Sequence, residues 1–275
     1  MSKLLHAGFA RLFRNKVLLI CFGILGMTNG VSIVANHFSD AHDAPDSFLL
    51  SGLMVVSIMT AVLTATFLGS EHQFGTIRNK LIIGHGRAAV YCSSFIVCFA
   101  GMLMLLAVVW ILTLILGNLL LGGFMQSDQQ LLVLLLRSFL AMTALTALYT
   151  ALGLCIHSKS ISAVMAVICA FLILLASVVI IQMLMEPEYY PADQVIMTEE
   201  MTYETAPDDP SLVINPYYLS GMKREMYETI NDISPVSQML DESGVLTTKA
   251  VIIPLAEITV LMAVGLLVFR KRDLK

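Results

Sequence analysis

Long apolar stretches separated by short polar segments dominate the chain. Six of them have the roughly 20 mostly apolar residues that a membrane-spanning helix requires: 17–36, 49–70, 90–117, 131–156, 161–185 and 250–269. None alternates apolar and polar residues with a period of two, as the strands of a membrane barrel do. The first stretch is too long for a cleaved signal peptide, and five more follow it. The pattern predicts an all-α integral membrane protein with six transmembrane helices.

Composition excludes a water-soluble domain. Hydrophobic residues make up 57% of the chain and charged residues only 13%, against about 25% charged residues in an ordinary soluble domain. The segments expected on the cytoplasmic side (1–16, 71–89, 157–160 and 270–275) are too short to form a catalytic domain. No G-x-x-x-x-G-K-[ST] phosphate-binding loop occurs in the chain. We therefore expect no enzyme activity, and any use of ATP requires a separate subunit.

The basic residues are concentrated in the loops on one side of the expected spans. These loops hold 12 of the 16 Lys and Arg residues, namely Lys3, Arg11, Arg14, Lys16, Arg78, Lys80, Arg87, Lys159, Arg270, Lys271, Arg272 and Lys275. Because loops rich in Lys and Arg stay on the cytoplasmic side, both termini are predicted to be cytoplasmic, in a multi-pass protein of the plasma membrane.

The N-terminal segment has the pattern of an amphipathic helix over residues 2–15. Leu5, Phe9, Leu12 and Phe13 recur at helical spacing and share one face. Such a helix would lie in the cytoplasmic membrane interface, with its bases near anionic headgroups. The alternative is a positively charged anchor that only sets the topology.

The segment GSEHQFGTIRNKLIIGHGR, residues 69–87, predicts a short helix between the second and third spans. Thr76 can cap its start and Gly84 can end it. Ile77, Leu81 and Ile82 are expected to pack on one side, and Arg78 and Lys80 to face the cytosol. A rigid helix here could transmit force between spans, whereas the alternative is a basic connector that obeys the positive-inside rule.

A long polar segment, 187–249, precedes the last span and is expected on the extracellular side. It is rich in tyrosine and proline, and its acids include Glu188, Asp193, Glu199, Glu200, Glu204, Asp208 and Asp209. The pattern predicts a helix from about Leu219 to Ile230 and a short turn near Val236–Leu240. The segment could receive a cationic or amphipathic substrate, or it could simply seal the outer mouth of the bundle.

Two ionisable residues fall inside the expected spans. Arg137 and Glu257 both lie roughly 10 Å below the outer boundary, counted at about 1.5 Å per residue. Burying a charged side chain at this depth costs free energy unless the charge is paired or hydrated. We expect the two to form an intramembrane charge pair or to share a wet cavity. In the alternative, Arg137 extends outward and Glu257 is protonated or faces water.

The first outer loop offers a second group of polar side chains. Its candidate metal ligands are His37, Asp40, His42, Asp43 and Asp46. Their spacing matches no structural zinc pattern, and acid-rich outer loops are expected anyway. No metal site, no cofactor site and no contact with nucleic acid is therefore expected of this chain.

Three segments carry a resemblance to a known family. The segment 71–87 resembles the cytoplasmic loop of bacterial ABC type-2 exporter permeases. It has an acidic residue at the end of a span, followed by Gly-Thr, a basic helix and Gly-x-x-Arg. The segment GLLVFRKRDLK at 265–275 is similar to the last span and tail of that family. The segment NPYYLSGMKREMYETINDISPVSQ at 215–238 is similar to an ectodomain stretch in small members of it.

The resemblance implies that the 71–87 helix is a coupling helix that docks on an ABC ATPase subunit, which would hold ATP and Mg²⁺. The residues matching the motif, and hence the expected contacts, are Glu71, Gly75, Thr76, Ile77, Arg78 and Asn79. A second permease subunit would complete a homodimer or heterodimer in the lipid bilayer. The implied function is export of an amphipathic peptide, drug or lipid-like substrate.

Other functions remain open at this stage. An ion-coupled secondary carrier would have ionisable residues near the membrane midplane and an internal repeat, and no repeat is visible. An intramembrane enzyme would need paired polar residues deep in the spans, whereas all six histidines lie in loops or at span ends. A ligand-sensing membrane protein would use the 187–249 segment.

Overall fold

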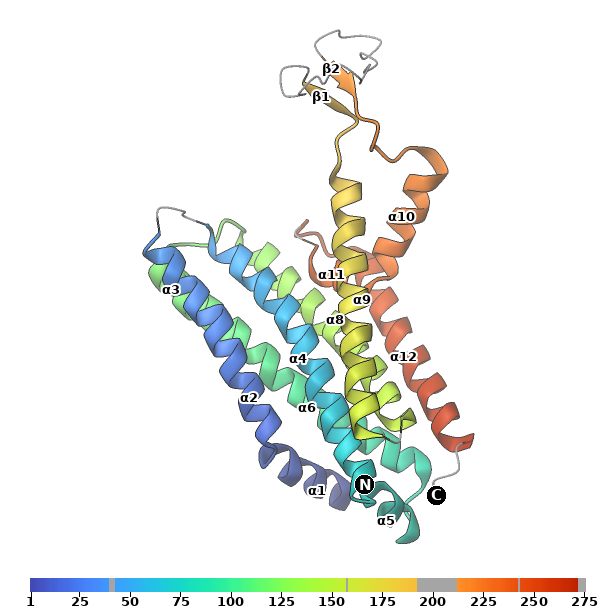
Figure 1. The fold of residues 1–275 in the computed structure, drawn as a ribbon. Helices are drawn as coiled ribbons and strands as arrows, with labels where there is room; N and C mark the ends of the chain where they lie inside the picture. The colour runs from blue at the N-terminus through green and yellow to red at the C-terminus, as the bar shows by residue number, and fades with distance from the viewer. Residues whose placement is uncertain (40–42, 157, 192–211, 242, 272–275) are drawn as a thin grey trace.

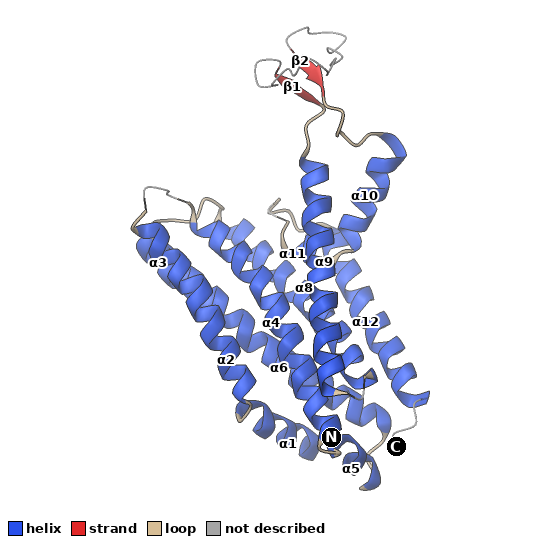
Figure 2. Ribbon diagram, viewed as in Figure 1, coloured by secondary structure: helices blue, strands red, loops and turns tan. Residues whose placement is uncertain are grey.

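The computed structural model describes the chain except for residues 40–42, 157, 192–211, 242 and 272–275. Almost all of the described chain is helical, with two short strands in addition (Figure 2). The acids predicted to line the outer segment lie largely in 192–211, outside the described residues.

Among the described residues, six helical segments are long and apolar enough to cross a membrane. They are Lys16–His37, formed by α2, η1 and α3; Pro45–Gln73, which is α4; Arg87–Leu120, formed by α6, η2 and α7; Asp128–Cys155, which is α8; Lys159–Met185, which is α9; and Thr248–Lys271, which is α12. The protein is thus an all-α, multi-pass membrane protein, and the expectation of six spans is confirmed. Most of the helix ends lie a few residues beyond the predicted bounds, because polar residues continue the backbone hydrogen bonding past the apolar stretch. The exceptions are the ends of α8, at Cys155, one residue before its predicted end, and of α9, at Met185, as predicted.

Each of the first and third spans is interrupted by one wider turn. The first span comprises α2 (Lys16–Leu25), the π-helix η1 (Gly26–Gly30) and α3 (Val31–His37). The third comprises α6 (Arg87–Leu112), the π-helix η2 (Thr113–Gly117) and α7 (Asn118–Leu120). Hydropathy alone does not predict π-helices, because a single wider turn leaves the apolar character of the span unchanged.

The two π-helices are joined by a buried hydrogen bond. Asn29 Nδ2 donates to Thr113 Oγ1 at 3.2 Å. Gly52 on α4 faces this contact: a Cβ at that position would lie 2.6 Å from Asn29 Nδ2. The absence of a side chain at Gly52 therefore allows Asn29 to reach Thr113, and this buried polar pair holds the first and third spans together.

The helices form one bundle with α4 and α8 at its centre (Figure 1). α4 packs on α6, α8 and α9, and α8 packs on α12. α2 and α3 lie along one side of the bundle, and α9 and α12 lie along the other. The short helices α1 and α5 and the last turn of α12 lie at one end, called here the α5 end. The opposite end is called the α10 end.

The N-terminal amphipathic helix is present as α1, Ser2–Phe13, and lies across the α5 end (Figure 1). Its buried residues are Leu4, Gly8 and Leu12, which pack toward α6. The predicted apolar face was Leu5, Phe9, Leu12 and Phe13, and Phe13 is 60% exposed. The buried face differs because Gly8 approaches α6 closely: a Cβ there would lie 2.6 Å from Val97 Cγ2.

The segment before the last span folds in two parts. Strands β1 (Tyr189–Pro191) and β2 (Leu212–Ile214) pair antiparallel, with Tyr189 opposite Ile214. Helices α10 (Gly221–Ile233) and α11 (Pro235–Met239) follow, close to the predicted helix and turn. α10 buries no residue, whereas Val236, Ser237, Gln238 and Met239 of α11 are all buried. α11 is therefore inserted into the α10 end of the bundle, where it packs on α8 and α9.

Candidate functional site

The short helix predicted between the second and third spans is α5, Thr76–Ile82, at the α5 end of the bundle. Its start differs from the prediction, because Gly75 and not Thr76 is the N-cap, and no side chain caps the helix. Gly75 has φ +63° and turns the chain sharply between α4 and α5, which places Thr76 already inside the helix. At the other end Gly84 has φ +98°, and its N–H donates to Leu81 O at 3.0 Å. Gly84 thus ends the helix as predicted.

A buried carboxylate ties α5 to α4. Glu71, near the end of α4, has a side chain only 3% exposed, and Lys80 Nζ on α5 lies 3.0 Å and 2.8 Å from its two oxygens. Lys80 was predicted to face the cytosol, and that prediction is wrong. The turn at Gly75 folds α5 back along the end of α4, which brings Lys80 to Glu71. Pairing offsets the cost of burying both charges.

The same carboxylate also binds α1. Arg11 Nη1 lies 2.9 Å from Glu71 Oε1. Arg11, Glu71 and Lys80 together form what we call the Glu71 cluster, which joins α1, α4 and α5. Local sequence patterns did not reveal Arg11 or Lys80 as members, because the cluster depends on how α1 crosses the α5 end.

The six expected coupling residues separate into two groups by exposure. Glu71 and Ile77 are buried, and Gly75 and Thr76 are half-buried, so they support α5 from within. Arg78 and Asn79 are exposed. Three large apolar side chains close to them in sequence are also exposed: Phe74 at 75%, Ile82 at 71% and Ile83 at 77%. Ile82 was predicted to pack, and that prediction is wrong, because the face of α5 that carries Ile77 and Lys80 is the buried one. We call Phe74, Arg78, Asn79, Ile82 and Ile83 the α5 tip.

The intramembrane pair predicted between Arg137 and Glu257 is not formed. The Arg137 guanidinium instead pairs with Asp241, in the segment after α11, and also donates to the carbonyl of Val245. Glu257 lies on α12, and within the described residues its Oε2 is buried without a hydrogen-bond partner. The prediction failed because it compared depths within spans only. The insertion of α11 carries a loop carboxylate to Arg137, which is 3% exposed.

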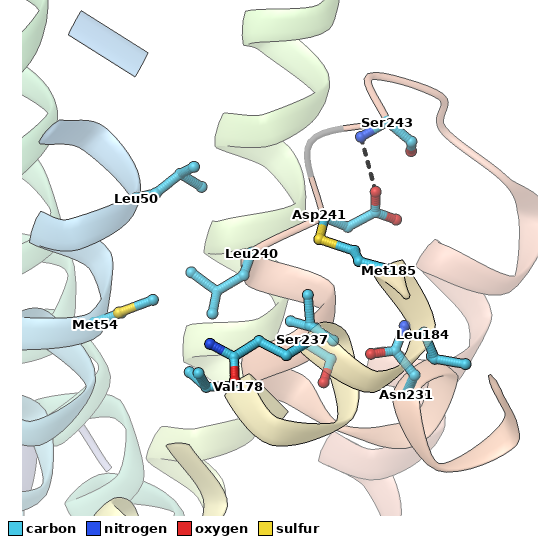
Figure 3. Close-up of a pocket in the computed structure, with 12 residues that line it drawn as sticks. Leu50, Met54, Val178, Leu184, Met185, Asn231, Ser237, Leu240, Asp241 and Ser243 are labelled. Carbon is cyan, nitrogen blue, oxygen red and sulfur yellow. Dashed lines mark hydrogen bonds between the residues drawn. The ribbon is translucent and has the colours of Figure 1, made fainter. Parts of the chain in front are cut away.

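Hydrogen bonding stabilises the charged form of Asp241. Partial burial alone would raise the pKa of this carboxyl, but bonds from the Ser243 backbone and from Arg137 outweigh it and hold the pKa below its usual value. Ser243 N donates to Asp241 Oδ1 at 2.8 Å (Figure 3). Asp241 is therefore ionised at neutral pH, and its pairing with Arg137 joins the segment after α11 to α8 at Asp241 and Val245.

A pocket of about 480 Å³ opens beside this ion pair, between α4, α9 and the α10–α11 segment. Leu50 and Met54 of α4 point toward it from one side (Figure 3). The other lining residues are Val178, Ile181, Gln182, Leu184, Met185, Asn231, Ser237, Leu240, Asp241 and Ser243. We call it the α10-end pocket. Its mostly apolar wall with a few polar groups suits an amphipathic molecule.

Two of the candidate metal ligands of the first outer loop, His37 and Asp46, have other roles. His37 Nδ1 lies 2.7 Å from Leu120 O, and Asp46 Oδ2 accepts from Met125 N at 2.8 Å. Asp40 and His42 lie outside the described residues. Among the residues that the structure describes, no group of three His, Cys, Asp or Glu side chains is placed to hold a metal ion.

Comparison with known proteins adds no relative to this picture. No protein-family model matches the chain, and no curated protein matches it. The Glu71 cluster with the α5 tip, and the Arg137–Asp241 pair with its pocket, are therefore the features from which function is inferred.

Proposed function

We propose that the protein is the membrane-spanning subunit of an ABC exporter, powered by a separate ATP-hydrolysing subunit that docks on the α5 tip. The observation that carries this proposal is the attachment of α5. A short helix at one end of the bundle is held to a central helix by a buried ion pair, while its far side exposes apolar and basic groups. An exposed apolar patch beside polar groups is typical of a protein-interaction surface.

In this proposal the α5 end is cytoplasmic. The helix ends and turns that meet there, including the first residues of α2, α6 and α9, together carry most of the basic residues of the chain, for example Arg11 on α1, Arg78 on α5 and Lys271 at the end of α12. Clusters of Lys and Arg next to membrane spans are retained on the cytoplasmic side. An ATPase in the cytosol would then reach α5 without crossing the membrane.

The connection from α5 to the rest of the molecule supports a mechanical role. A force on α5 would pass through Lys80 and Glu71 to α4, which contains 29 residues and is thus about 43 Å long. α4 packs on α6, α8 and α9, and near its other end Leu50 and Met54 line the α10-end pocket. Movement at the ATPase contact would therefore alter a cavity at the opposite end of the bundle.

The proposed substrate is amphipathic, and the proposed assembly is a dimer of six-span subunits with two ATPases. The α10-end pocket has a mostly apolar wall with Asn231, Ser237 and Asp241 as polar groups. Within the described residues, Asn231 Oδ1 and Ser237 Oγ are buried without a hydrogen-bond partner. A substrate with polar groups on an apolar body could satisfy them.

Co-purification tests the proposal. The tagged chain, extracted from native membranes in mild detergent, should retain a protein that contains a G-x-x-x-x-G-K-[ST] loop and hydrolyses ATP. The double variant Arg78→Glu, Ile83→Asp should lose it. The matched variant Lys223→Glu, Met222→Asp places the same charge change on exposed residues of α10 and should retain it. If wild type retains no such ATPase and transport continues in ATP-depleted vesicles, the proposal is wrong.

One observation favours a second function, an ion-coupled carrier. Glu257 lies within the sixth span, and its Oε2 is buried without a hydrogen-bond partner among the described residues. Ionisable groups in such positions serve in ion and proton pathways. Transport by a carrier would depend on an ion gradient, would stop in the Glu257→Gln variant and would not require ATP.

A further inference from the structure

A second pocket, at the α5 end, has a different chemical character. It has a volume of about 450 Å³ and lies where α1 turns into α2, against the end of α4 and the first residue of α9. Its lining residues are Arg11, Arg14, Asn15, Lys16, Val17, Thr66, Phe67, Ser70, Glu71, Phe74, Thr76 and Lys159. We call it the basic pocket.

Three cations around the basic pocket have no partner within the described part of the chain. Arg14, Lys16 and Lys159 are exposed, and the structure gives their side chains no hydrogen bond or ion pair. The one acid among the lining residues, Glu71, is already paired with both Arg11 and Lys80. The pocket therefore has a surplus of positive charge that no described protein group neutralises.

The positions of these cations are set by the backbone. Asn15 caps α2 by accepting from Val17 N at 3.0 Å, which fixes the turn that carries Arg14 and Lys16. Lys159 begins α9 directly against α4: a Cβ on Gly69 would lie 2.8 Å from Lys159 Cα. Two segments distant in sequence, the α1–α2 turn and the start of α9, thus bring three unpaired charges to one cavity.

The pocket also has apolar walls. Val17 is half-buried at the start of the first span, and Phe67 and Phe74 belong to the end of α4 and the turn after it. The cavity lies where the apolar spans meet the polar end of the bundle, which is the depth of lipid headgroups. A ligand there would place an anionic group among the cations and an apolar body along the spans.

We propose that the basic pocket binds the phosphate group of an anionic membrane phospholipid. Arginine and lysine side chains are the usual partners of phosphate oxygens, and basic pockets between membrane helices bind anionic headgroups. A zwitterionic lipid carries a positively charged group next to its phosphate, and the three unpaired cations of the pocket would repel that group. The basic pocket shares Phe74 with the α5 tip, but its three unpaired cations, Arg14, Lys16 and Lys159, lie outside the tip. Lipid binding by these cations therefore does not depend on the proposed ATPase contact.

Lipid binding to the purified protein, without any ATPase, tests the inference. Native mass spectrometry and the thermal midpoint would be followed on adding phosphatidylglycerol, phosphatidylcholine of the same acyl chains, or inorganic phosphate at equal concentration. Wild type should bind phosphatidylglycerol about tenfold more tightly than phosphatidylcholine, as several basic residues near a headgroup would give. Inorganic phosphate should not displace the lipid.

Variants locate the site. Arg14→Gln, Lys16→Gln, Lys159→Gln should remove the preference for phosphatidylglycerol, whereas Lys3→Gln, Arg270→Gln, Lys271→Gln removes the same charge from the same end and should keep it. The charge-conserving variant Arg14→Lys, Lys16→Arg, Lys159→Arg should also keep it, and it gives an answer if the first variant does not fold.

Five results would overturn the inference. Three concern the preference for phosphatidylglycerol: its absence in wild type, its persistence in the Arg14→Gln, Lys16→Gln, Lys159→Gln variant, and its equal loss in the control variant. The fourth is loss of the preference in the charge-conserving variant. The fifth is displacement of the lipid by inorganic phosphate, which would indicate a site for the free ion.

Discussion

Lys80 Nζ lies 2.8 Å from Glu71 Oε2, although the two residues belong to different helices joined by a sharp turn. With Arg11 on the other carboxylate oxygen, this contact makes α1, α4 and α5 one mechanical unit. The exposed residues of the α5 tip are then free to bind a partner, while the buried residues hold α5 in place. The residues of the 71–79 motif, which the resemblance treats as one contact surface, thus comprise two groups. Glu71 and Ile77 are buried and hold α5 in place, whereas Arg78 and Asn79 are exposed.

Removing the charge of Glu71 should release α5. In Glu71→Gln, Lys80 would remain buried without its counter-charge, and breaking a buried pair in this way costs about 3 kcal/mol. Hydrogen exchange of residues 76–82 should accelerate strongly, with little change in α8. The double variant Glu71→Gln, Lys80→Met removes both charges and should recover much of the protection. Wild-type exchange in Glu71→Gln would show that the pair does not hold α5.

The left-handed turn at Gly75 should be sensitive to side chains for conformational reasons alone. A Cβ at Gly75 would meet no atom within 4 Å, but φ is +63°, and this region costs an ordinary L-residue about 1–2 kcal/mol. Gly75→Ala should therefore lower the stability of the α4–α5 junction by about 1 kcal/mol, and Gly75→Asn by less.

Gly86→Ala is the matched control for Gly75→Ala, because Gly86 has φ −63° and open space around it. It should be nearly neutral. The measurement is the thermal midpoint together with protease cleavage at the junction. Equal effects of the two alanines would contradict the role assigned to the backbone at Gly75.

The Arg137–Asp241 pair should hold Asp241 and Val245 against α8 down to low pH. The folded-state pKa of Asp241 is below its ordinary value of 3.8, so its stabilisation is complete above that value and is lost as pH falls through the folded pKa. A fluorophore at Leu246→Cys should keep high anisotropy from neutral pH to about 4 and lose it below that. In Asp241→Asn the anisotropy should be low and independent of pH; a high value there would argue against the pair.

Charge exchange should distinguish the two possible partners of Arg137. Arg137→Asp combined with Asp241→Arg keeps opposite charges in contact and should restore part of the stability lost in each single variant. Arg137→Glu combined with Glu257→Arg should restore none, because Glu257 is not the partner in the structure. Rescue by the second exchange would mean that the pair predicted from depth forms in the membrane.

The packing around Gly52 should not tolerate a side chain. A Cβ there would lie 2.6 Å from both Asn29 Nδ2 and Val109 Cγ1, and overpacking of this kind typically costs about 1–3 kcal/mol. Gly52→Ala should lower the thermal midpoint measurably, whereas Gly23→Ala, with nothing within 4 Å, should not. An unchanged midpoint would show that α4 can move away from η1 and α6 at no cost.

The spans, and most of the helices between them, were predictable from the sequence. The length of an apolar stretch is enough to predict a spanning helix, because every backbone N–H and C=O group in lipid must form its hydrogen bond within its own helix. The same local reasoning located α1, α5, α10 and α11, since turn and cap residues such as Gly84 and Ser234 act on their neighbours. These features need no knowledge of the other spans.

The partners of the charges were decided only by the tertiary structure. Nothing in the local sequence distinguishes Lys80 from other basic residues, and it pairs with Glu71 because the turn at Gly75 packs α5 on α4. Asp241 likewise pairs with Arg137 because α11 is inserted into the bundle next to it. The rotation of α1, set by Gly8 against Val97, is of the same kind. Ion pairs and close helix contacts join residues far apart along the chain, so their geometry depends on how whole helices pack, which no local pattern encodes.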